Sequence, residues 1–382
     1  MRILFVSECY PTREAPQYGI FIQQQAQALE ALGNTVDVLI PQRSNRNGDM
    51  EKEAAAMKIE YRTIRYELFP VLAAQSVYCQ IEQYIQKNDY DLVAVHITSD
   101  TVLKMVVKVC NRLGIAVVAH YHGLNVWEEF TTRHPLRQKL YAWRRRAILQ
   151  KIQGAVGVSD KVSDILRQRL KDIPVQTVYN GVDIGKFQRK AHRNEEFHIV
   201  GVGNLIEIKG FAYLLDAFAQ LHAQQPKTHL DIVGQGVLLP TLQEQAQRLG
   251  IADCVTFHGK VPYEQVAEIM GSGDLFVLPS FYEALGCVYL EAMGCGLPTI
   301  GVSGMGIDEI ISHGENGLLV KPKDSCDLYE KMRQVTLDTE LAEKLAENGA
   351  TTACRYTWDA SAKTLNTFYE ACVNHEFPVF NG

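Results

Sequence analysis

The sequence predicts an α/β protein built from two doubly wound domains, each around a parallel sheet. Short apolar runs alternate with longer amphipathic segments, as in parallel sheets that carry helices on both faces. The alternation starts again after about residue 190, and 382 residues are enough for two or three domains. We therefore expect one domain at 1–187, a second at 188–355, and a C-terminal helix at about 356–382 that could pack back on the first.

Each predicted strand is a short apolar run between polar segments. In the first domain these runs are residues 2–6, 36–40, 92–96, 116–120, 155–158 and 177–179. In the second domain they are residues 198–202, 230–233, 255–258, 275–278 and 299–302. The clearest helix is predicted at residues 20–32, where Gly33 and Asn34 stop it. Open parallel sheets bind ligands beyond the carboxyl ends of their strands, so unusual residues there are candidate site residues.

Composition and charge exclude several classes of protein. With 47% hydrophobic and 21% charged residues, the chain is neither disordered nor collagen-like. A net charge of −6 argues against a general nucleic-acid binder. Residues 1–187 hold 24 basic and 19 acidic side chains, whereas residues 188–382 hold 14 and 25. The nine Cys show no disulfide or zinc spacing, and no signal peptide or membrane-spanning run is expected, which together favour the cytoplasm.

The strongest candidate site follows the strand predicted at 275–278. Glu283 and Glu291 are separated by seven residues, with Gly286 between them. A helix that begins near Gly286 would present N–H groups suited to a phosphate. Glu291 would then lie in an otherwise apolar helix, where a carboxylate is costly to bury unless it is hydrogen-bonded. We interpret Glu291 as an acceptor for ribose hydroxyls and Glu283 as an acceptor for sugar hydroxyls. An ordinary loop carboxylate and an ordinary helical Glu are the alternative.

A glycine-rich turn with a lysine follows the strand predicted at 198–202. Gly201, Gly203 and Gly210 allow a close approach, and Lys209 adds a point charge that suits a pyrophosphate. A surface lysine at a helix start is the alternative. The dinucleotide fingerprint Gly-x-Gly-x-x-Gly is absent, because Ile206 occupies the place of the third glycine. Nicotinamide-dependent dehydrogenases are therefore disfavoured.

Two strand ends in the first domain also carry unusual residues. His122 and Gly123 follow the strand predicted at 116–120, and Asn125 adds a polar group. A structural histidine is an equally good interpretation at this point. After the first strand, a long loop ends at Tyr18 and Gly19, directly before the first helix, which is a further candidate seat for an anion.

In this order along nearly the whole chain, these clusters resemble the retaining glycosyltransferases of family 4. That family has the GT-B fold, in which two Rossmann-like domains face each other across a cleft. The stretch from Glu283 to Glu291 matches the family's Glu-x7-Glu motif, and Asn180-Gly-Val-Asp183 matches the end of its first domain. Residues 201–210 match its phosphate-binding turn, and His122-Gly123 match its sugar-facing histidine.

The resemblance implies a role for each matching residue. It implies catalytic roles for His122, Glu283 and Lys209, and it places the main chain near Lys260 and Val261 against the nucleotide base. The implied donor-binding residues are Gly19, Gly203, Asn204, Lys209, Lys260, Val261, Glu283, Ala284, Leu285, Gly286 and Glu291. Tyr18 and Asn125 are expected on the acceptor side. Asn204 stands where the family usually has Arg, so one cation expected on the pyrophosphate is missing.

The implied function is a retaining, metal-independent glycosyltransferase of the hexosyltransferase type. It would move a sugar from a nucleotide-diphosphate sugar to a glycan or lipid-linked acceptor in cell-surface polysaccharide biosynthesis. The nucleotide sugar is a co-substrate, and no further cofactor is expected. A non-catalytic nucleotide-sugar-binding protein on the same fold is the alternative, and a hydrolysing or epimerising relative also stays open.

A basic segment of the first domain is a candidate surface for approaching the acceptor. Between Glu129 and Asp160 the chain has no acidic residue, and it carries Arg144, Arg145 and Arg146. One interpretation is an amphipathic helix packed on its own sheet. The other is peripheral binding to an anionic membrane at the inner face of the cell membrane, because each Lys or Arg near such a surface contributes about 1 kcal/mol. No nucleic-acid partner is expected.

Overall fold

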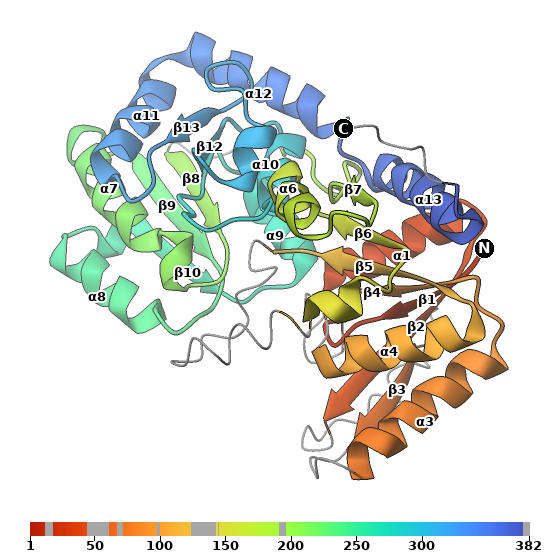
Figure 1. Cartoon of the computed structure of the whole chain (residues 1–382). Helices are drawn as coiled ribbons and strands as arrows, with labels where there is room; N and C mark the ends of the chain where they lie inside the picture. Colours follow the sequence, from red (N-terminus) through yellow and green to blue (C-terminus); the bar gives the residue numbers. More distant parts are fainter. Residues whose placement is uncertain are drawn as a thin grey trace. The chain divides into compact units, whose positions relative to one another are not determined.

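The computed structural model describes residues 1–11, 18–43, 61–66, 72–97, 100–123, 143, 145–190 and 196–376. The chain divides into two compact units (Figure 1): Met1–Tyr179 with Trp358–Gly382, and Asn180–Thr357. Each is an α/β unit with a parallel sheet, as the sequence predicts. No helix within the described residues is both long enough and apolar enough to cross a membrane.

The boundary between the units lies at Tyr179/Asn180 rather than at 187/188. Phe187 is fully buried in the second unit, where its ring packs edge-on against Tyr263 with 5.3 Å between centroids. The main-chain N–H of Val182 donates to the carbonyl of Tyr356 over 2.8 Å. These contacts tie residues 180–190 and 356–357 to the second unit. Helix α13 (Trp358–Asn374) then belongs to the first unit.

The first unit has, among its described residues, a sheet of seven parallel strands in the order β3-β2-β1-β4-β5-β6-β7. The strands are β1 (Arg2–Val6), β2 (Thr35–Arg43), β3 (Tyr61–Tyr66), β4 (Leu92–Val95), β5 (Ala116–Tyr121), β6 (Gly154–Gly157) and β7 (Val175–Thr177). The helices are α1 (Ile20–Ala31), α3 (Leu72–Lys87), α4 (Asp100–Leu113), α6 (Asp160–Arg169) and α13. Ile22 and Leu29 of α1 and Leu365 and Tyr369 of α13 are fully buried in one apolar cluster with the central strands.

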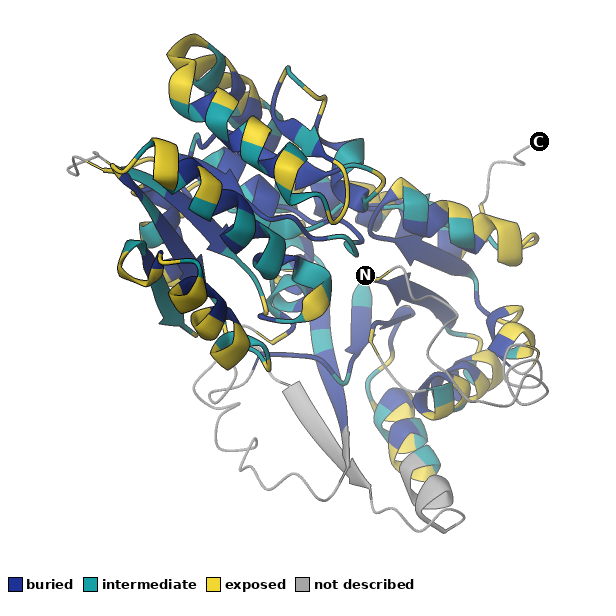
Figure 2. Cartoon of the chain, turned by 90° about the vertical axis from the view of Figure 1, so that its left-hand side faces the viewer, coloured by how far each residue is buried: buried dark blue, intermediate teal, exposed yellow. Residues whose placement is uncertain are grey.

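The second unit has, where it is described, six parallel strands in the order β10-β9-β8-β11-β12-β13. They are β8 (Phe197–Val202), β9 (Thr228–Val233), β10 (Val255–Gly259), β11 (Leu275–Val277), β12 (Thr299–Val302) and β13 (Leu318–Val320). The helices are α7 (Phe211–Gln224), α8 (Leu239–Arg248), α9 (Tyr263–Gly271), α10 (Cys287–Gly294), α11 (Ser325–Leu337) and α12 (Thr339–Ala353). In both units the strands form the buried layer, and the outer faces of the helices are exposed (Figure 2).

The predicted strands are confirmed except the last one of the first domain, which is displaced, and two further strands were not predicted. Strand β3 does not form an apolar run, because Arg62, Thr63 and Arg65 interrupt it. Strand β13 is only three residues long. Strand β7 ends at Thr177, where the predicted strand begins. Short edge strands such as these carry too few apolar residues to be recognised without their neighbours.

Candidate functional site

The second unit gathers charged donor-site candidates at the carboxyl ends of β8 and β11. Lys209 ends a short 3-10 turn, Glu207–Lys209, that follows β8, and Glu283 lies on the loop after β11. The Lys209 ammonium donates to the Glu283 carboxylate, and the two side chains are only 18% and 14% exposed. Because little water surrounds the pair, the Coulomb attraction between the two side chains is stronger than it would be on the surface.

The loop between Glu283 and helix α10 has a tightly constrained shape. Gly286 precedes α10 with φ of 81°, and a Cβ there would lie 2.6 Å from ring atoms of Tyr289, so only glycine fits. Ala284 and Leu285 are buried, and the N–H of Gly306 donates to the Glu283 carbonyl over 3.0 Å. The predicted helix start near Gly286 is therefore correct. The N-terminal end of α10 carries the partial positive charge that suits a phosphate.

Glu291 lies one turn inside α10 and has a hydrogen-bond partner. The hydroxyl of Tyr263 donates to its Oε1 over 2.7 Å. Burial raises the pKa of Glu291 to about 7, although the bond from Tyr263 opposes this shift. A carboxyl group with this pKa changes its charge near neutral pH. It can accept hydrogen bonds from hydroxyl groups most strongly when it is ionised.

The remaining predicted donor residues of this unit lie on neighbouring loops. The N–H of Gly203 donates to the Val233 carbonyl over 3.0 Å, and Asn204 next to it is exposed. Lys260 is exposed and Val261 is buried, and both lie between β10 and Tyr263 at the start of α9. These positions follow β8 and β10, so they share the sheet edge that carries Lys209.

In the first unit, Gly19 directly precedes helix α1. Its φ is 76°, and a Cβ there would lie 2.6 Å from the carbonyl oxygen of Cys9. Only glycine allows the start of α1 to come this close to the segment after β1. Tyr18, beside it, is 51% exposed.

Three histidines, two buried and one half-buried, form a column at the carboxyl ends of β4 and β5. His96 follows β4, His120 lies near the end of β5, and His122 directly follows β5. His96 Nδ1 lies 3.1 Å from His122 Nε2, and His120 Nε2 lies 2.7 Å from the hydroxyl of Tyr369. Burial lowers the pKa of all three, that of His122 to about 4. At neutral pH the column therefore consists of neutral imidazoles.

These three histidines form a possible metal-ligand group by distance but not by orientation. Among the described residues, this is the one group of three His, Cys, Asp or Glu side chains whose possible metal-ligand atoms all lie within 4.8 Å of one another. Their ring planes differ by only 15° to 29°. The His96 and His122 ring centroids are 5.4 Å apart and their facing nitrogens are 3.1 Å apart, so these two nitrogens point at each other and not at a shared ion. The observed arrangement is a hydrogen-bonded and stacked one.

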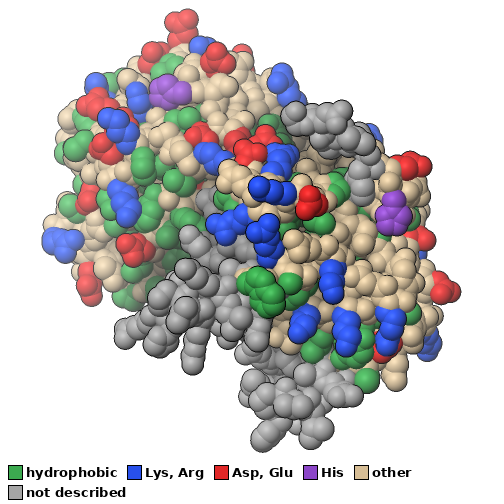
Figure 3. Space-filling view, viewed as in Figure 1, with side chains coloured by type: hydrophobic (Ala, Val, Ile, Leu, Met, Phe, Trp, Pro, Cys, Tyr) green, Lys and Arg blue, Asp and Glu red, His purple; other side chains and the backbone are tan. Residues whose placement is uncertain are grey.

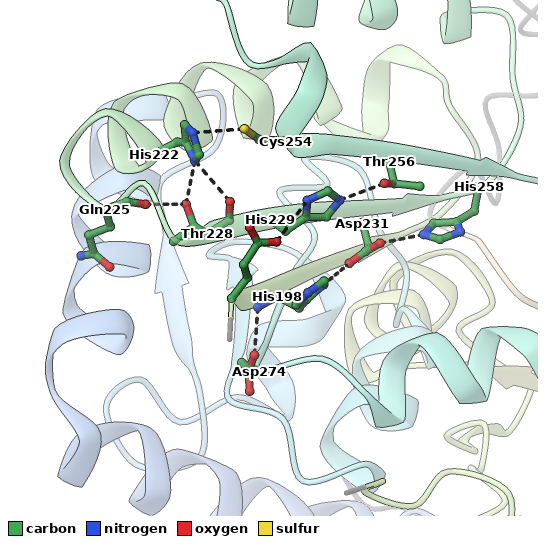
Figure 4. Close-up of polar contacts among 11 residues, drawn as sticks. His198, His222, Gln225, Thr228, His229, Asp231, Cys254, Thr256, His258 and Asp274 are labelled. Atoms are coloured by element: carbon green, nitrogen blue, oxygen red, sulfur yellow. Dashed lines mark hydrogen bonds and ion pairs between the residues drawn. The ribbon is translucent and has the colours of Figure 1, made fainter. Parts of the chain in front are cut away.

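A second polar cluster lies on the strands of the second unit, away from the loops at their carboxyl ends (Figure 4). Asp231 on β9 is 2.8 Å from His198 Nδ1 on β8 and 2.7 Å from His258 Nε2 on β10. The hydrogen bond with Asp231 raises the pKa of His198, and it outweighs the effect of burial. Asp231 thus links three neighbouring strands on one face of the sheet.

The expectation that Arg145 faces an anionic membrane is wrong. Arg145 is only 7% exposed, and its Nε lies 3.4 Å from Asp100 Oδ1 at the start of α4. Arg145 therefore lies buried in the first unit beside an acidic side chain and does not face solvent. Arg146 is exposed, and Arg144 lies outside the described residues, as does Asn125.

Other cations nevertheless gather on the surface of the first unit. Lys and Arg side chains lie on the face that carries α4 (Figure 3), where Lys104, Lys108 and Arg112 are exposed. Trp143 is 67% exposed, so its side chain is not packed in the core.

Sequence reasoning missed the residues that support the candidate site. His96 could have been found, because it ends an apolar run in the same way as His120. Tyr263 has no such signal, since nothing in its neighbourhood indicates a contact with Glu291, 28 positions away. Tyr369 was placed only in a C-terminal helix, and its contact with His120 spans 249 positions.

Comparison with known proteins covers both units. Residues 184–352 match the family described as glycosyl transferases group 1, and residues 19–186 match glycosyltransferase family 4. D-inositol 3-phosphate glycosyltransferase from Corynebacterium jeikeium is 30% identical over 215 residues, 51% of each chain. The chain thus spans about half the length of this relative. Alpha-D-kanosaminyltransferase from Streptomyces kanamyceticus is 26% identical over 278 residues, 67% of this chain and 71% of the relative.

Solved structures show the same fold. HepE from Anabaena, in complex with UDP and glucose, has a TM-score of 0.78 at 20% identity and covers 97% of this chain and 100% of its own. The two matched family segments together run through both sheets and through all the charged loops described above. The chain belongs to the glycosyl transferases of group 1 and has their GT-B fold.

Proposed function

We propose that the protein is a retaining glycosyltransferase that uses a nucleoside diphosphate sugar, in the first place a UDP-sugar. The observation that carries the proposal is the Lys209–Glu283 ion pair beside the start of α10. The complex of the structural relative HepE with UDP supports the choice of nucleotide.

The ion pair gives a physical account of donor binding. A diphosphate brings strong acceptor oxygens that compete with Glu283 for the Lys209 ammonium. Once Lys209 donates to phosphate, the Glu283 carboxylate is free to accept from hydroxyls of the sugar. Lys209 and the N-terminal end of α10 together supply local positive charge in a unit whose acidic residues outnumber its basic ones.

Glu291 is suited to the ribose. Two neighbouring ribose hydroxyls are donors, and an ionised carboxylate offers acceptor oxygens for both. Tyr263 already donates to Glu291 Oε1, which holds the carboxyl group in one orientation. Val261 and the main chain around Lys260 would hold the base.

In the proposed reaction the bond from the anomeric carbon to the diphosphate breaks, and a bond to the acceptor oxygen forms on the same face. The acceptor hydroxyl gives its proton to the leaving phosphate oxygen, so no carboxylate needs to act as nucleophile. Lys209 stabilises the charge that develops on the diphosphate. His122 is assigned a contact with the transferred sugar.

Metal independence remains part of the proposal. The Asp-x-Asp sequence from Asp89 to Asp91 lies before β4, and Asp91 accepts there from the N–H of Arg2 over 2.7 Å. It therefore lies at the amino ends of the strands of the first unit, whereas His96 and His122 lie at their carboxyl ends. Undiminished transfer in the presence of a chelator would agree with this assignment.

A glycan or lipid-linked acceptor used in cell-surface polysaccharide synthesis is the proposed partner. Contact with an anionic membrane would use the exposed cations Lys104, Lys108 and Arg146 in place of Arg145. Sedimentation with anionic vesicles at low salt should then decrease when these three residues become Glu. Binding that ignores this change would favour an acceptor free in solution.

The test of function starts with a thermal-shift screen of nucleotide sugars, because a ligand at about 100 times its Kd adds about 2.7 kcal/mol of stability. The best donor is then incubated with candidate acceptors, and NMR of the product gives the anomeric configuration. Retention of configuration supports the proposal, whereas inversion refutes it. Stabilisation without any turnover would point to the non-catalytic alternative.

A further inference from the structure

The contact between His96 and His122 has the geometry of an in-plane hydrogen bond. His96 Nδ1 and His122 Nε2 are 3.1 Å apart, and the two ring planes differ by only 15°. His96 is 4% exposed, and Phe5 packs against its ring with 4.4 Å between centroids. The opposite nitrogens, His96 Nε2 and His122 Nδ1, are buried and have no hydrogen-bond partner among the residues that the structure describes.

One shared proton couples the tautomers of the two rings. A neutral imidazole carries a single N–H, and burial keeps both rings neutral by lowering their pKa values. If His96 Nδ1–H donates, His122 must carry its own proton on Nδ1. If His122 Nε2–H donates instead, His122 Nδ1 is a bare acceptor and His96 carries its proton on Nε2.

The surroundings favour the first of these two states. In the second state an N–H on His96 Nε2, in a ring that is only 4% exposed, would have no acceptor among the described residues. A buried donor without a partner costs free energy, and such donors are rare. In the first state the unpaired N–H lies on His122 Nδ1. His122 is half-buried whereas His96 is 4% exposed, so His122 is the ring that lies closer to solvent and to a ligand.

We propose that His96 is a positioning residue that holds His122 with its proton on Nδ1, so that this N–H donates to a hydroxyl oxygen of the transferred sugar. The proposal rests on the proposed function, in which His122 contacts that sugar. His120 supports the arrangement, because it stacks on His96 with 4.2 Å between centroids. His120 is itself anchored by Tyr369 of α13.

The first test needs no ligand. In the full chain labelled with ¹⁵N-histidine, nitrogen chemical shifts distinguish the two tautomers of each ring, and a His122→Gln sample assigns the His122 signals. We expect the Nδ1–H form of His122 in the wild type and a mixture of both forms in His96→Leu. Tyr369→Phe is the matched control, because it removes a buried hydrogen bond of the same column and should leave the His122 tautomer unchanged. An Nε2–H form in the wild type, or no change in His96→Leu, would overturn the proposal.

The second test separates positioning from simple structural support. With the donor found in the screen, His96→Leu should lower kcat/KM by about tenfold or more, as expected for loss of one oriented hydrogen bond. His96→Asn, whose amide can donate from nearly the place of Nδ1, should recover part of this loss. The thermal shift caused by UDP, which lacks the sugar, should be the same in all these variants.

The double variant His96→Leu/His122→Gln decides whether His96 acts through His122. We expect its kcat/KM to equal that of His122→Gln alone. Losses that add would assign His96 an independent role and overturn the proposal. If the wild type transfers no sugar at all, the proposed function fails, while the NMR experiment still decides the tautomer.

Discussion

The charged loops of the second unit and the histidine column of the first unit occupy equivalent places in their sheets, and they use opposite electrostatics. Both lie at the carboxyl ends of central parallel strands. In the second unit, Lys209 and Glu283 form an ion pair with each other. In the first unit, His96 and His120 are buried among neutral groups, which lowers their pKa values and keeps them neutral.

This difference indicates how two domains with the same kind of sheet can bind different parts of a ligand. A charged pair can change partners when a diphosphate arrives, because the ligand replaces one charge by another. A neutral hydrogen-bonded column cannot attract an anion in this way. It can instead hold one donor atom in a defined direction, which is what contact with an uncharged sugar requires.

The largest effect we expect is the response of the first unit to mild acid. Below the usual histidine pKa of about 6.5 the unfolded chain takes up protons on all three column histidines, whereas the folded chain resists this. Stability that is present above this pH is therefore lost as the pH falls, by up to about 1.4 kcal/mol per imidazole and pH unit.

Urea unfolding at pH 7.5, 6.5 and 5.5, followed by tryptophan fluorescence, measures this loss. The signal reports on the first unit, which contains every tryptophan of the chain: Trp127, Trp143 and Trp358. His120→Gln keeps a group that can bond to Tyr369 but does not titrate, so its stability should fall less steeply. Equal slopes for this variant and the wild type would contradict the account of a neutral column.

Removing the ammonium group of Lys209 should abolish most donor binding. Hydrogen bonds to charged groups contribute about 1.5–3 kcal/mol, so Lys209→Met should weaken the binding of UDP and of the nucleotide sugar by at least about tenfold. Calorimetric titration measures both affinities. Lys227→Met, a change of another lysine of the same unit that lies before β9, is the control. Unchanged affinity in Lys209→Met would remove Lys209 from the diphosphate site.

The start of α1 tests whether the first unit depends on a close backbone approach. Gly19→Ala combines an unfavourable φ with a clash against Cys9, so we expect a loss of about 1–3 kcal/mol in unfolding free energy. Gly33 also has a positive φ, but no atom lies within 4 Å of a Cβ there. Gly33→Ala should therefore cost less, and thermal denaturation compares the two. An equal cost would mean that the clash at Gly19 is relieved elsewhere.

Glu291 should make nucleotide binding depend on pH. Its pKa of about 7 means that the carboxylate becomes fully ionised only above neutral pH. UDP affinity should therefore rise between pH 6 and pH 8, by up to about tenfold. In Glu291→Gln the affinity should be lower and should lack this rise. A pH profile that is the same in both proteins would show that Glu291 does not bind the ribose.

The smallest effect concerns His198, whose response to pH is opposite to that of the column. Its pKa is raised by the bond to Asp231, so its contribution is complete below the usual pKa and is lost as the pH rises through the raised value. The loss should be about 1 kcal/mol or less, because the side chain keeps some contact with water. Comparing the stability of wild type and His198→Gln at pH 6 and pH 8.5 measures it, and a constant difference between them would contradict the assignment.

The sequence alone determined the two-domain α/β organisation, and it predicted that Lys209, Glu283 and Glu291 follow the carboxyl ends of strands. These features depend on local apolar runs and on motifs confined to ten residues or so, which can be recognised without knowing what lies beside them. Its prediction for Arg145 was wrong, because the partner Asp100 lies 45 positions earlier in the chain.

Only the tertiary structure decided which partners these residues have. The Lys209–Glu283 pair spans 74 positions, and the contact of His120 with Tyr369 spans 249. The boundary at Tyr179/Asn180 likewise depends on where Phe187 is buried. The physical reason is that burial and charge pairing depend on neighbours in space. Parallel strands bring together residues that whole helices and connections separate along the chain.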